Sequence, residues 1–215
     1  MLKDHSIRLQ SHWNTVYRER GPDAVSWYRP HLDLSMQLLQ EGGLDNDSRV
    51  VDVGGGASTL VDDILAFGVW DMTVVDLSET ALEMSKTRLG ADASKIQWIV
   101  DDITTLRLPE GRYTHWHDRA VFHFLTDPKD VQAYVRAVEY AVCSGGYLVI
   151  AGFAHEGPQR CSGLVVARRS AQDIADIFSK QFTLVTSKPE VHATPGAQVE
   201  QAFIYVLLQK HKVQG

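Results

Sequence analysis

Short runs rich in β-branched residues alternate along the chain with amphipathic stretches, and this alternation constrains the fold more than any other feature. The first run is Arg49–Val53, and Met72–Asp76, Lys95–Val100 and Tyr147–Phe153 follow it. Tyr113–His117 gives a weaker signal of the same kind. Between these runs, apolar residues recur at helical spacing. Strands that alternate with helices predict right-handed βαβ units and a mostly parallel α/β sheet with helices on both faces.

Capping signals bound the predicted helices. Ser78 predicts the N-cap of a helix that runs to Leu89. Asp127 followed by Pro128 predicts the start of another helix, because proline suits the first helical position. The Gly145–Gly146 pair predicts the end of that helix.

The two ends of the chain depart from the alternating pattern. Phe182–Ser187 and Gln201–Leu208 read as strands with no helix between them, which favours antiparallel pairing at the edge of the sheet. Residues 1–45 precede the first strand and hold a predicted helix near His31–Gln40. We predict that they form a helical flank or lid on a single domain made by residues 46–215.

Composition excludes several kinds of protein. The chain has 215 residues with a net charge of -6 and no basic block, which argues against a nucleic-acid partner. No apolar run approaches the roughly 18 residues of a membrane span, and the N-terminus lacks the apolar stretch of a secretory signal. Two cysteines, Cys143 and Cys161, are too few for a disulfide framework. These features predict a soluble, cytoplasmic protein.

A glycine-rich turn follows the first strand, at Gly54, Gly55 and Gly56. Glycines between a strand and a helix let the backbone approach a ligand closely, and open α/β sheets bind ligands at this edge. The dinucleotide fingerprint G-x-G-x-x-G would need a glycine at position 59, where the chain has Thr59. The turn therefore predicts a ligand site without the usual pyrophosphate cradle.

Acidic residues end the second and third predicted strands. Asp76 could accept hydrogen bonds from both hydroxyls of a ribose, or could simply cap the helix after it. Asp102 could accept from an exocyclic adenine amine while Ile103 packs on the ring, or could belong to a solvated acidic loop. Together with the glycine turn, these strand ends predict a pocket for an adenosine-bearing ligand.

The segments VVDVGGGAS, VVD and VDDI resemble the motif series of class I S-adenosylmethionine-dependent methyltransferases over about residues 48–210. The resemblance implies a Rossmann-like, mostly parallel seven-stranded sheet with an antiparallel edge strand. It also implies that S-adenosylmethionine is the cofactor. Two positions depart from the pattern: Ser58 replaces a frequent glycine, and Thr114 replaces a frequent aspartate. The cofactor-binding residues implied are Asp52, Gly54, Gly55, Gly56, Ser58, Asp76, Leu77, Asp102, Ile103 and His117.

A narrower resemblance rests on Trp13-x-x-x-Tyr17, Ser26-Trp27-Tyr28 and Asp118-Arg119-Ala120. These segments are similar to those of bacterial relatives of the lysine methyltransferases that act on citrate synthase and elongation factor. The resemblance does not by itself assign a substrate. It does place an acid, Asp118, at the end of the fourth strand.

Methyl transfer from a sulfonium needs the nucleophile, methyl carbon and sulfur in a line, and a proton acceptor if the nucleophile carries a proton. We predict Asp118 and His123 as catalytic residues. Asp118 could instead pair with Arg119 or cap a turn, and His123 lies in an apolar segment where histidines often belong to the core. His115 and His117 share one face of a predicted strand, but two ligands are too few for a closed metal site, so no metal is expected.

Aromatic residues of the N-terminal flank could cap the cofactor and shape an acceptor pocket, or could simply seal the flank against the domain. The predicted substrate-binding residues are Trp13, Tyr17, Trp27, Tyr28, Arg119 and Cys161.

The leading functional hypothesis is methyl transfer from S-adenosylmethionine to a small-molecule nucleophile. Transfer to a protein lysine is the alternative, and a nicotinamide-dependent oxidoreductase or an inactive cofactor-binding module are further ones. The sequence leaves open the acceptor atom and the oligomeric state.

Overall fold

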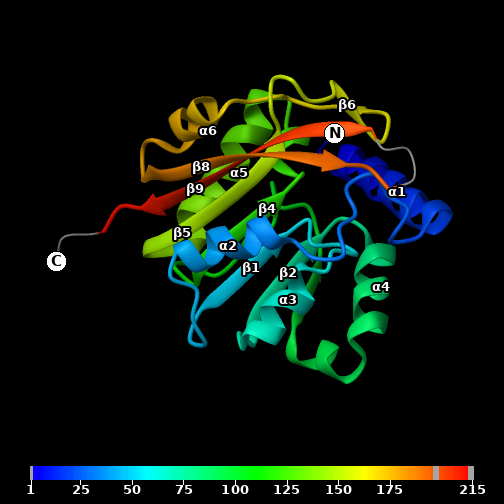
Figure 1. Ribbon diagram of the computed structural model, residues 1–215, viewed down its shortest axis with the longest axis horizontal. Coiled ribbons are helices and arrows are strands. Elements are labelled where there is room, and N and C mark those ends of the chain that lie inside the picture. Colours follow the sequence, from blue (N-terminus) through cyan, green and yellow to red (C-terminus); the bar gives the residue numbers. More distant parts are fainter. Residues whose placement is uncertain (1, 196–198, 213–215) are drawn as a thin grey trace.

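A seven-stranded sheet forms the centre of the molecule (Figure 1). The computed structural model describes residues 2–195 and 199–212. The strand order is β3-β2-β1-β4-β5-β9-β8, and the first five strands are mutually parallel. β9 runs antiparallel to β5 and to the edge strand β8, which confirms the predicted fold class. The strands are β1 Arg49–Val53, β2 Asp71–Asp76, β3 Gln97–Val100, β4 Tyr113–Arg119, β5 Val142–Phe153, β8 Phe182–Ala193 and β9 Glu200–Lys210.

Helices cover both faces of the sheet. α2 and α3 pack on one face in a buried cluster that includes Leu38, Ile64 and Val50. α5 and α6 pack on the other face, where Tyr134 and Phe178 are fully buried. The helices are α1 Leu2–Arg20, α2 Asp33–Glu41, α3 Leu60–Phe67, α4 Glu79–Leu89, α5 Pro128–Ala141 and α6 Ala171–Phe178, with 3₁₀ turns at Gly90–Lys95 and Phe122–Phe124.

The predicted caps begin two of these helices. The Ser78 hydroxyl accepts a hydrogen bond of 3.1 Å from the Ala81 backbone N–H at the start of α4. The Asp127 carboxylate accepts one of 2.8 Å from the Lys129 N–H at the start of α5. These side chains satisfy backbone N–H groups that have no partner within the helix.

The predicted stop at Gly145–Gly146 is wrong. α5 ends at Ala141, and the chain enters β5 directly at Val142, so both glycines lie inside the strand. A β-carbon on Gly146 would lie 2.9 Å from the Thr114 carbonyl oxygen of β4. Close strand packing therefore accounts for this glycine.

α1 lies at the end of the sheet to which the parallel strands point (Figure 1). The sequence predicted a helical flank but located a helix only near 31–40, which corresponds to α2. A small hairpin, β6 Arg160–Cys161 and β7 Leu164–Val165, follows β5. Within the described ranges, none of the helices combines the length and apolarity that crossing a bilayer requires.

Candidate active site at the carboxyl end of the sheet

The glycine turn after β1 has no room for larger side chains. Gly54 and Gly56 adopt positive φ angles of 70° and 40°. A β-carbon on Gly55 would lie 2.5 Å from Asp52 Oδ2, and one on Gly56 would lie 2.8 Å from Asp76 Oδ2. The predicted acids therefore converge on the turn, and only glycine allows its backbone to pass this close to them.

Two side chains of α4 hold this turn in place, and no sequence motif identifies them. The buried Ser85 hydroxyl donates to the Gly56 carbonyl oxygen at 2.7 Å. The Arg88 guanidinium donates to the carbonyl oxygens of Ala57 and Ser58, at 3.0 and 2.6 Å. Ser58 thus contributes its backbone carbonyl to this network, and its hydroxyl accepts from the Leu60 N–H at 3.2 Å.

Asp76 ends β2 beside the glycine turn. Its Oδ1 accepts a hydrogen bond of 2.7 Å from the Ser78 N–H. Burial raises the pKa of Asp76 to about 7, and the nearby Asp52 carboxylate adds to this rise. Backbone N–H groups of Ser78, Gly56 and Leu77 oppose it by stabilising the anion. A ligand that donates two hydroxyl hydrogen bonds would favour the ionised form.

Asp102 and Ile103 follow β3 at the same edge. Asp102 Oδ1 accepts from the backbone N–H and the hydroxyl of Thr104, at 2.9 and 2.7 Å. Asp102 Oδ2 accepts from the Ser6 hydroxyl of α1 at 2.6 Å. Ile103 is buried in the apolar cluster that also contains Val53 and Val75. The strand end predicted to bind adenine is therefore in contact with α1.

Asp52 and His117 form a buried ion pair or hydrogen bond between β1 and β4. The His117 Nδ1 to Asp52 Oδ1 distance is 2.7 Å, and His117 Nε2 lies 2.9 Å from the Ser35 hydroxyl of α2. All three side chains are buried. His117 therefore reaches Asp52 and α2 rather than solvent, so its position suits the orientation of Asp52 better than direct contact with a ligand.

The position of Asp118 does not fit the catalytic role predicted for it. The side chain is fully buried. Its carboxylate accepts hydrogen bonds from the Tyr134 hydroxyl of α5 at 2.6 Å and from the N–H groups of Val121 and Phe122 at 2.9 to 3.2 Å. The strand alternation explains this, because Asp118 points to the α5 face while His117 and Arg119 point to the opposite one. The carboxylate anchors the turn after β4.

His123 is also buried, in the 3₁₀ turn after β4. Its ring contacts Phe124 and Phe153, at centroid distances of 4.4 and 4.8 Å. Burial, together with the positive charges of Arg169 and Arg119, lowers the pKa of His123 to about 3. The ring is therefore neutral at physiological pH. The Phe153 N–H approaches Nδ1 at 3.4 Å, whereas Nε2 is buried without a hydrogen-bond partner.

Three of the aromatic residues predicted to bind substrate contact one another near the turn after β4. Trp27 makes edge-on ring contacts with Trp13 at 5.8 Å and Tyr17 at 6.1 Å, and Trp13 contacts Phe124 at 5.2 Å. Burial raises the pKa of Tyr17 above its ordinary range, and the Asp76 carboxylate adds to this. We name Trp13, Tyr17, Trp27 and Phe124 the aromatic cluster.

Arg119 and Cys161 border the aromatic cluster. Arg119 Nη1 donates to the Trp27 carbonyl oxygen at 2.8 Å. Cys161 is buried, and burial raises the pKa of its thiol to about 11. The thiol is therefore protonated at neutral pH and a poor nucleophile. Tyr28 packs against the small apolar group that contains Tyr17, and it also lines a surface hollow with His192 and Val191.

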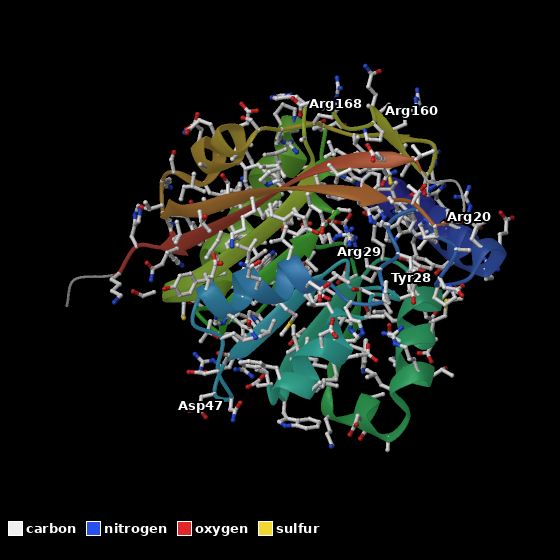
Figure 2. The ribbon with its side chains drawn as sticks, viewed as in Figure 1. Arg20, Tyr28, Arg29, Asp47, Arg160 and Arg168 are labelled. Carbon is white, nitrogen blue, oxygen red and sulfur yellow. The ribbon has the colours of Figure 1, made fainter. Side chains whose placement is uncertain are left out.

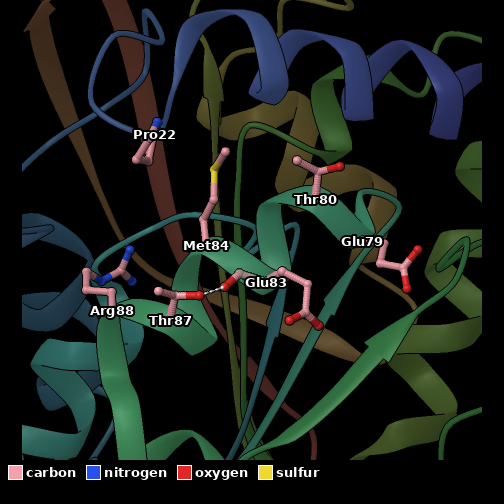
Figure 3. Close-up of a pocket in the computed structure, with 7 residues that line it drawn as sticks. All are labelled: Pro22, Glu79, Thr80, Glu83, Met84, Thr87 and Arg88. Atoms are coloured by element: carbon pink, nitrogen blue, oxygen red, sulfur yellow. Dashed lines mark hydrogen bonds between the residues drawn. The ribbon is translucent and has the colours of Figure 1, made fainter.

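Two surface hollows lie outside this edge. One, of about 670 Å³, lies on α4 under Pro22, and Figure 3 shows its lining residues Glu79, Glu83 and Arg88. The other, of about 540 Å³, is the one that Tyr28 lines. Neither is lined by Asp52, Asp76 or Asp102. In the described ranges, no three His, Cys, Asp or Glu side chains are grouped so that they could hold a metal ion.

Side chains of α1 reach the strand ends instead. The Asn14 side-chain oxygen accepts from the Ser78 hydroxyl at 2.8 Å and the Thr80 N–H at 3.2 Å. The Tyr17 hydroxyl oxygen would lie 3.1 Å from a β-carbon on Gly56. With the Ser6 contact to Asp102, α1 touches the turns after β1, β2 and β3.

These residues fit an adenosine-bearing sulfonium cofactor. The glycine turn keeps an unobstructed backbone, and Asp76 and Asp102 offer carboxylates at successive strand ends. The site lies where the chain order reverses between β1 and β4, which is the ligand-binding point of open α/β sheets. The fold is Rossmann-like, and this edge of the sheet suits a nucleoside-type ligand.

Comparisons with known proteins specify the class further. Residues 50–146 match the family model described as a methyltransferase domain. The chain is 26% identical over 121 residues to a mouse eEF1A lysine and N-terminal methyltransferase, a match that covers 56% of this chain and 17% of that protein. It is 20% identical to human EEF1A lysine methyltransferase 2, over 95% of this chain and 87% of the human one.

Solved structures share the fold. The chain resembles Burkholderia thailandensis 1,6-didemethyltoxoflavin-N1-methyltransferase, solved with S-adenosylhomocysteine, with a TM-score of 0.71 and 17% identity over 98% of this chain and 90% of that one. It also resembles a structure described for thioacetal formation in echinomycin biosynthesis, with a TM-score of 0.75 and 18% identity over 96% and 94% of the two chains. Part of the chain thus matches a methyltransferase domain, and the chain shares the fold of these solved methyltransferase structures.

Proposed function

We propose that the protein transfers the methyl group of S-adenosylmethionine to a small-molecule nucleophile. The observation that supports this choice is the kind of side chains that lie beside the carboxyl end of the sheet. Aromatic rings and Arg119 line it, while Asp118, the acid predicted to be catalytic, is hydrogen-bonded on the other face of the sheet. A lysine side chain approaches as a cation and would favour a carboxylate there.

In this proposal different residues bind different parts of the cofactor. Asp76 accepts the ribose hydroxyls, Asp102 accepts the adenine amine, and the glycine turn with Asp52 faces the methionine part. The bound cofactor supplies an electrophilic methyl group on a sulfonium. Trp13, Tyr17 and Trp27 exclude water from this centre and hold the acceptor in line, as α1 and the segment after it close over the edge. In this proposal residues 1–45 act as a lid on the domain formed by residues 46–215.

Neither Cys161, His123 nor Asp118 is placed to act as a general base beside the aromatic cluster. Burial raises the pKa of Cys161 and lowers that of His123, so both are neutral near pH 7. The Asp118 carboxylate accepts a hydrogen bond from Tyr134 of α5, on the other face of the sheet. The arrangement suits a nucleophile that reacts without enzymatic deprotonation, or one whose proton leaves through water.

Methylation of a protein lysine is the second candidate. It is favoured by the mouse and human relatives, whose names assign them eEF1A lysine methylation. The match to the mouse protein covers only 17% of that relative, so its substrate does not transfer directly.

A labelling experiment separates the two candidates. The purified protein is incubated with S-adenosylmethionine carrying a labelled methyl group and with a lysate that is divided into protein and small-molecule fractions. We expect label in the small-molecule fraction. Label confined to lysine residues of the protein fraction would establish the second candidate instead.

A further inference from the structure

Arg119 has an incomplete set of partners. Its Nε donates to the Tyr205 hydroxyl at 2.8 Å, and its Nη1 donates to the Trp27 carbonyl oxygen at 2.8 Å. Its Nη2 is buried and has no hydrogen-bond partner among the residues that the structure describes. A guanidinium group presents five N–H donors in a fixed plane, and leaving a buried donor unsatisfied is costly.

The positive charge of Arg119 is also not directly neutralised. Glu190 is the acid nearest to its network, since the Tyr205 hydroxyl donates to Glu190 Oε2 at 3.1 Å. Glu190 is already paired with Arg29, at 3.0 Å between Nη2 and Oε1. Among the described residues, no carboxylate oxygen is recorded within ion-pair distance of Arg119.

The surroundings of Arg119 carry an excess of positive charge, although the whole chain has a net charge of -6. Burial is the largest cause of the pKa shifts of Cys161 and His192, and nearby cations add their own contributions. Arg119 and Arg20 stabilise the Cys161 thiolate, while Arg119 and Arg29 lower the pKa of His192. Figure 2 shows Arg20 and Arg29 toward the end of the molecule where α1 lies.

Aromatic rings lie next to the guanidinium and continue away from it. Its central carbon lies over the Phe203 ring, 4.8 Å from the ring centroid. Phe203 contacts Phe153 at 4.8 Å, and Phe153 in turn contacts His123, whose Nε2 lacks a partner. The Trp27 carbonyl that Arg119 binds belongs to the aromatic cluster. A series of ring contacts therefore runs from Arg119 through Phe203 and Phe153 to His123.

We propose that the methyl acceptor is a small carboxylic acid whose carboxylate is bound by Arg119. A carboxylate accepts two parallel hydrogen bonds from a guanidinium, which would satisfy Nη2 and neutralise the charge. Arg119 ends β4 at the centre of the cofactor edge, so an acid held there would lie between the aromatic cluster and the methyl donor. This inference rests on the proposed small-molecule activity, and it gives the acceptor a chemical class.

The test uses the full chain loaded with S-adenosylhomocysteine, and calorimetry with three probes of similar size: benzoate, benzamide and benzylamine. We expect binding of benzoate and none of benzamide or benzylamine at matched concentrations. Arg119→Gln should weaken benzoate binding about tenfold or more, the usual effect of losing a hydrogen bond between charged groups. Arg119→Lys should restore part of it, because the charge remains while the two-point geometry is lost.

Arg136→Gln is the matched control, since this arginine is exposed on α5 away from the site. It should bind benzoate like the unmodified protein. Failure of S-adenosylhomocysteine itself to bind would contradict the proposed methyltransferase function. Binding of S-adenosylhomocysteine together with preference for benzylamine, or with no benzoate binding, would overturn only the carboxylate proposal. Unchanged benzoate binding by Arg119→Gln would overturn it as well.

Discussion

The Ser6 hydroxyl of α1 donates a 2.6 Å hydrogen bond to Asp102 Oδ2, the carboxylate at the end of β3, across 96 positions of sequence. This bond, those of Asn14 and the packing of Tyr17 attach α1 to the domain. The relationship matters because the same carboxylate is proposed to bind the adenine amine.

Replacing Ser6 by alanine should loosen α1. Loss of a hydrogen bond to a carboxylate weakens local structure by about 1–3 kcal/mol, which corresponds to faster opening of the attached segment. Hydrogen exchange measured by mass spectrometry should then be faster in residues 6–20 and unchanged in β4. Ser11→Ala, at an exposed position of the same helix, is the control. Equal exchange rates in Ser6→Ala and the unmodified protein would show that the contact does not hold the helix.

Cofactor affinity should rise with pH around neutrality. Burial raises the pKa of Asp76 to about 7 in the free protein, and only the ionised carboxylate can accept both ribose hydroxyls. The protonated form dominates below that pKa, so binding weakens as the pH falls. Between pH 6 and pH 8 we expect affinity for S-adenosylhomocysteine to increase about tenfold, as proton linkage requires for a single group.

Asp76→Asn is the control for this pH dependence. The amide does not titrate, so its affinity should be lower at pH 8 and should stay flat between pH 6 and pH 8. Calorimetric titrations at both pH values measure the difference. A pH profile that survives in Asp76→Asn would assign the titration to another group.

Asp118 should be important for stability and not for the chemical step. Its removal leaves the Tyr134 hydroxyl and the Val121 and Phe122 N–H groups without their acceptor. Asp118→Ala should lower the free energy of unfolding by about 3 kcal/mol. Urea unfolding measures this loss, and single-turnover methyl transfer at low temperature should retain its rate. A large fall in that rate with unchanged stability would restore the catalytic role predicted from sequence.

The buried pair of Asp52 and His117 should support cofactor binding indirectly. His117→Leu leaves the Asp52 carboxylate buried without its partner, at a cost of about 3 kcal/mol or more. Both stability and affinity for S-adenosylhomocysteine should fall. Ser35→Ala removes only the far end of this hydrogen-bonded chain and should have a smaller effect on both. Equal effects of the two substitutions would mean that His117 serves packing with α2 alone.

The sequence predicted the sheet well because each strand and its caps depend on local patterns. Ser78 and Asp127 cap helices as predicted, since a cap and the N–H it satisfies lie within a few residues. α1 was not located as a helix because it has little apolar periodicity. Its place in the fold is set by contacts with residues distant in sequence, such as the hydrogen bond of Asn14 with Ser78 and the ring contact of Trp13 with Phe124.

The positions of the strand-end acids could be predicted from the sequence. The surroundings of the residues predicted to be catalytic could not. Asp76 and the glycine turn follow from the order of strands and turns. Asp118 could not be judged from sequence, because its role depends on Tyr134, which a different element brings to it. The roles of Ser85 and Arg88 could not be predicted for the same reason, because their partners are backbone carbonyls of a turn about 30 positions away.

The contacts of α1 with three successive strand ends have a kinetic consequence. Ser6, Asn14 and Tyr17 lie along one helix, and each touches a different turn of the proposed cofactor site. Spent cofactor could not leave, nor fresh cofactor enter, while all three remain in place. The steady-state turnover rate would then be limited by the rate at which α1 moves away from the strand ends. Methyl transfer within a single closed complex would be faster than the overall cycle.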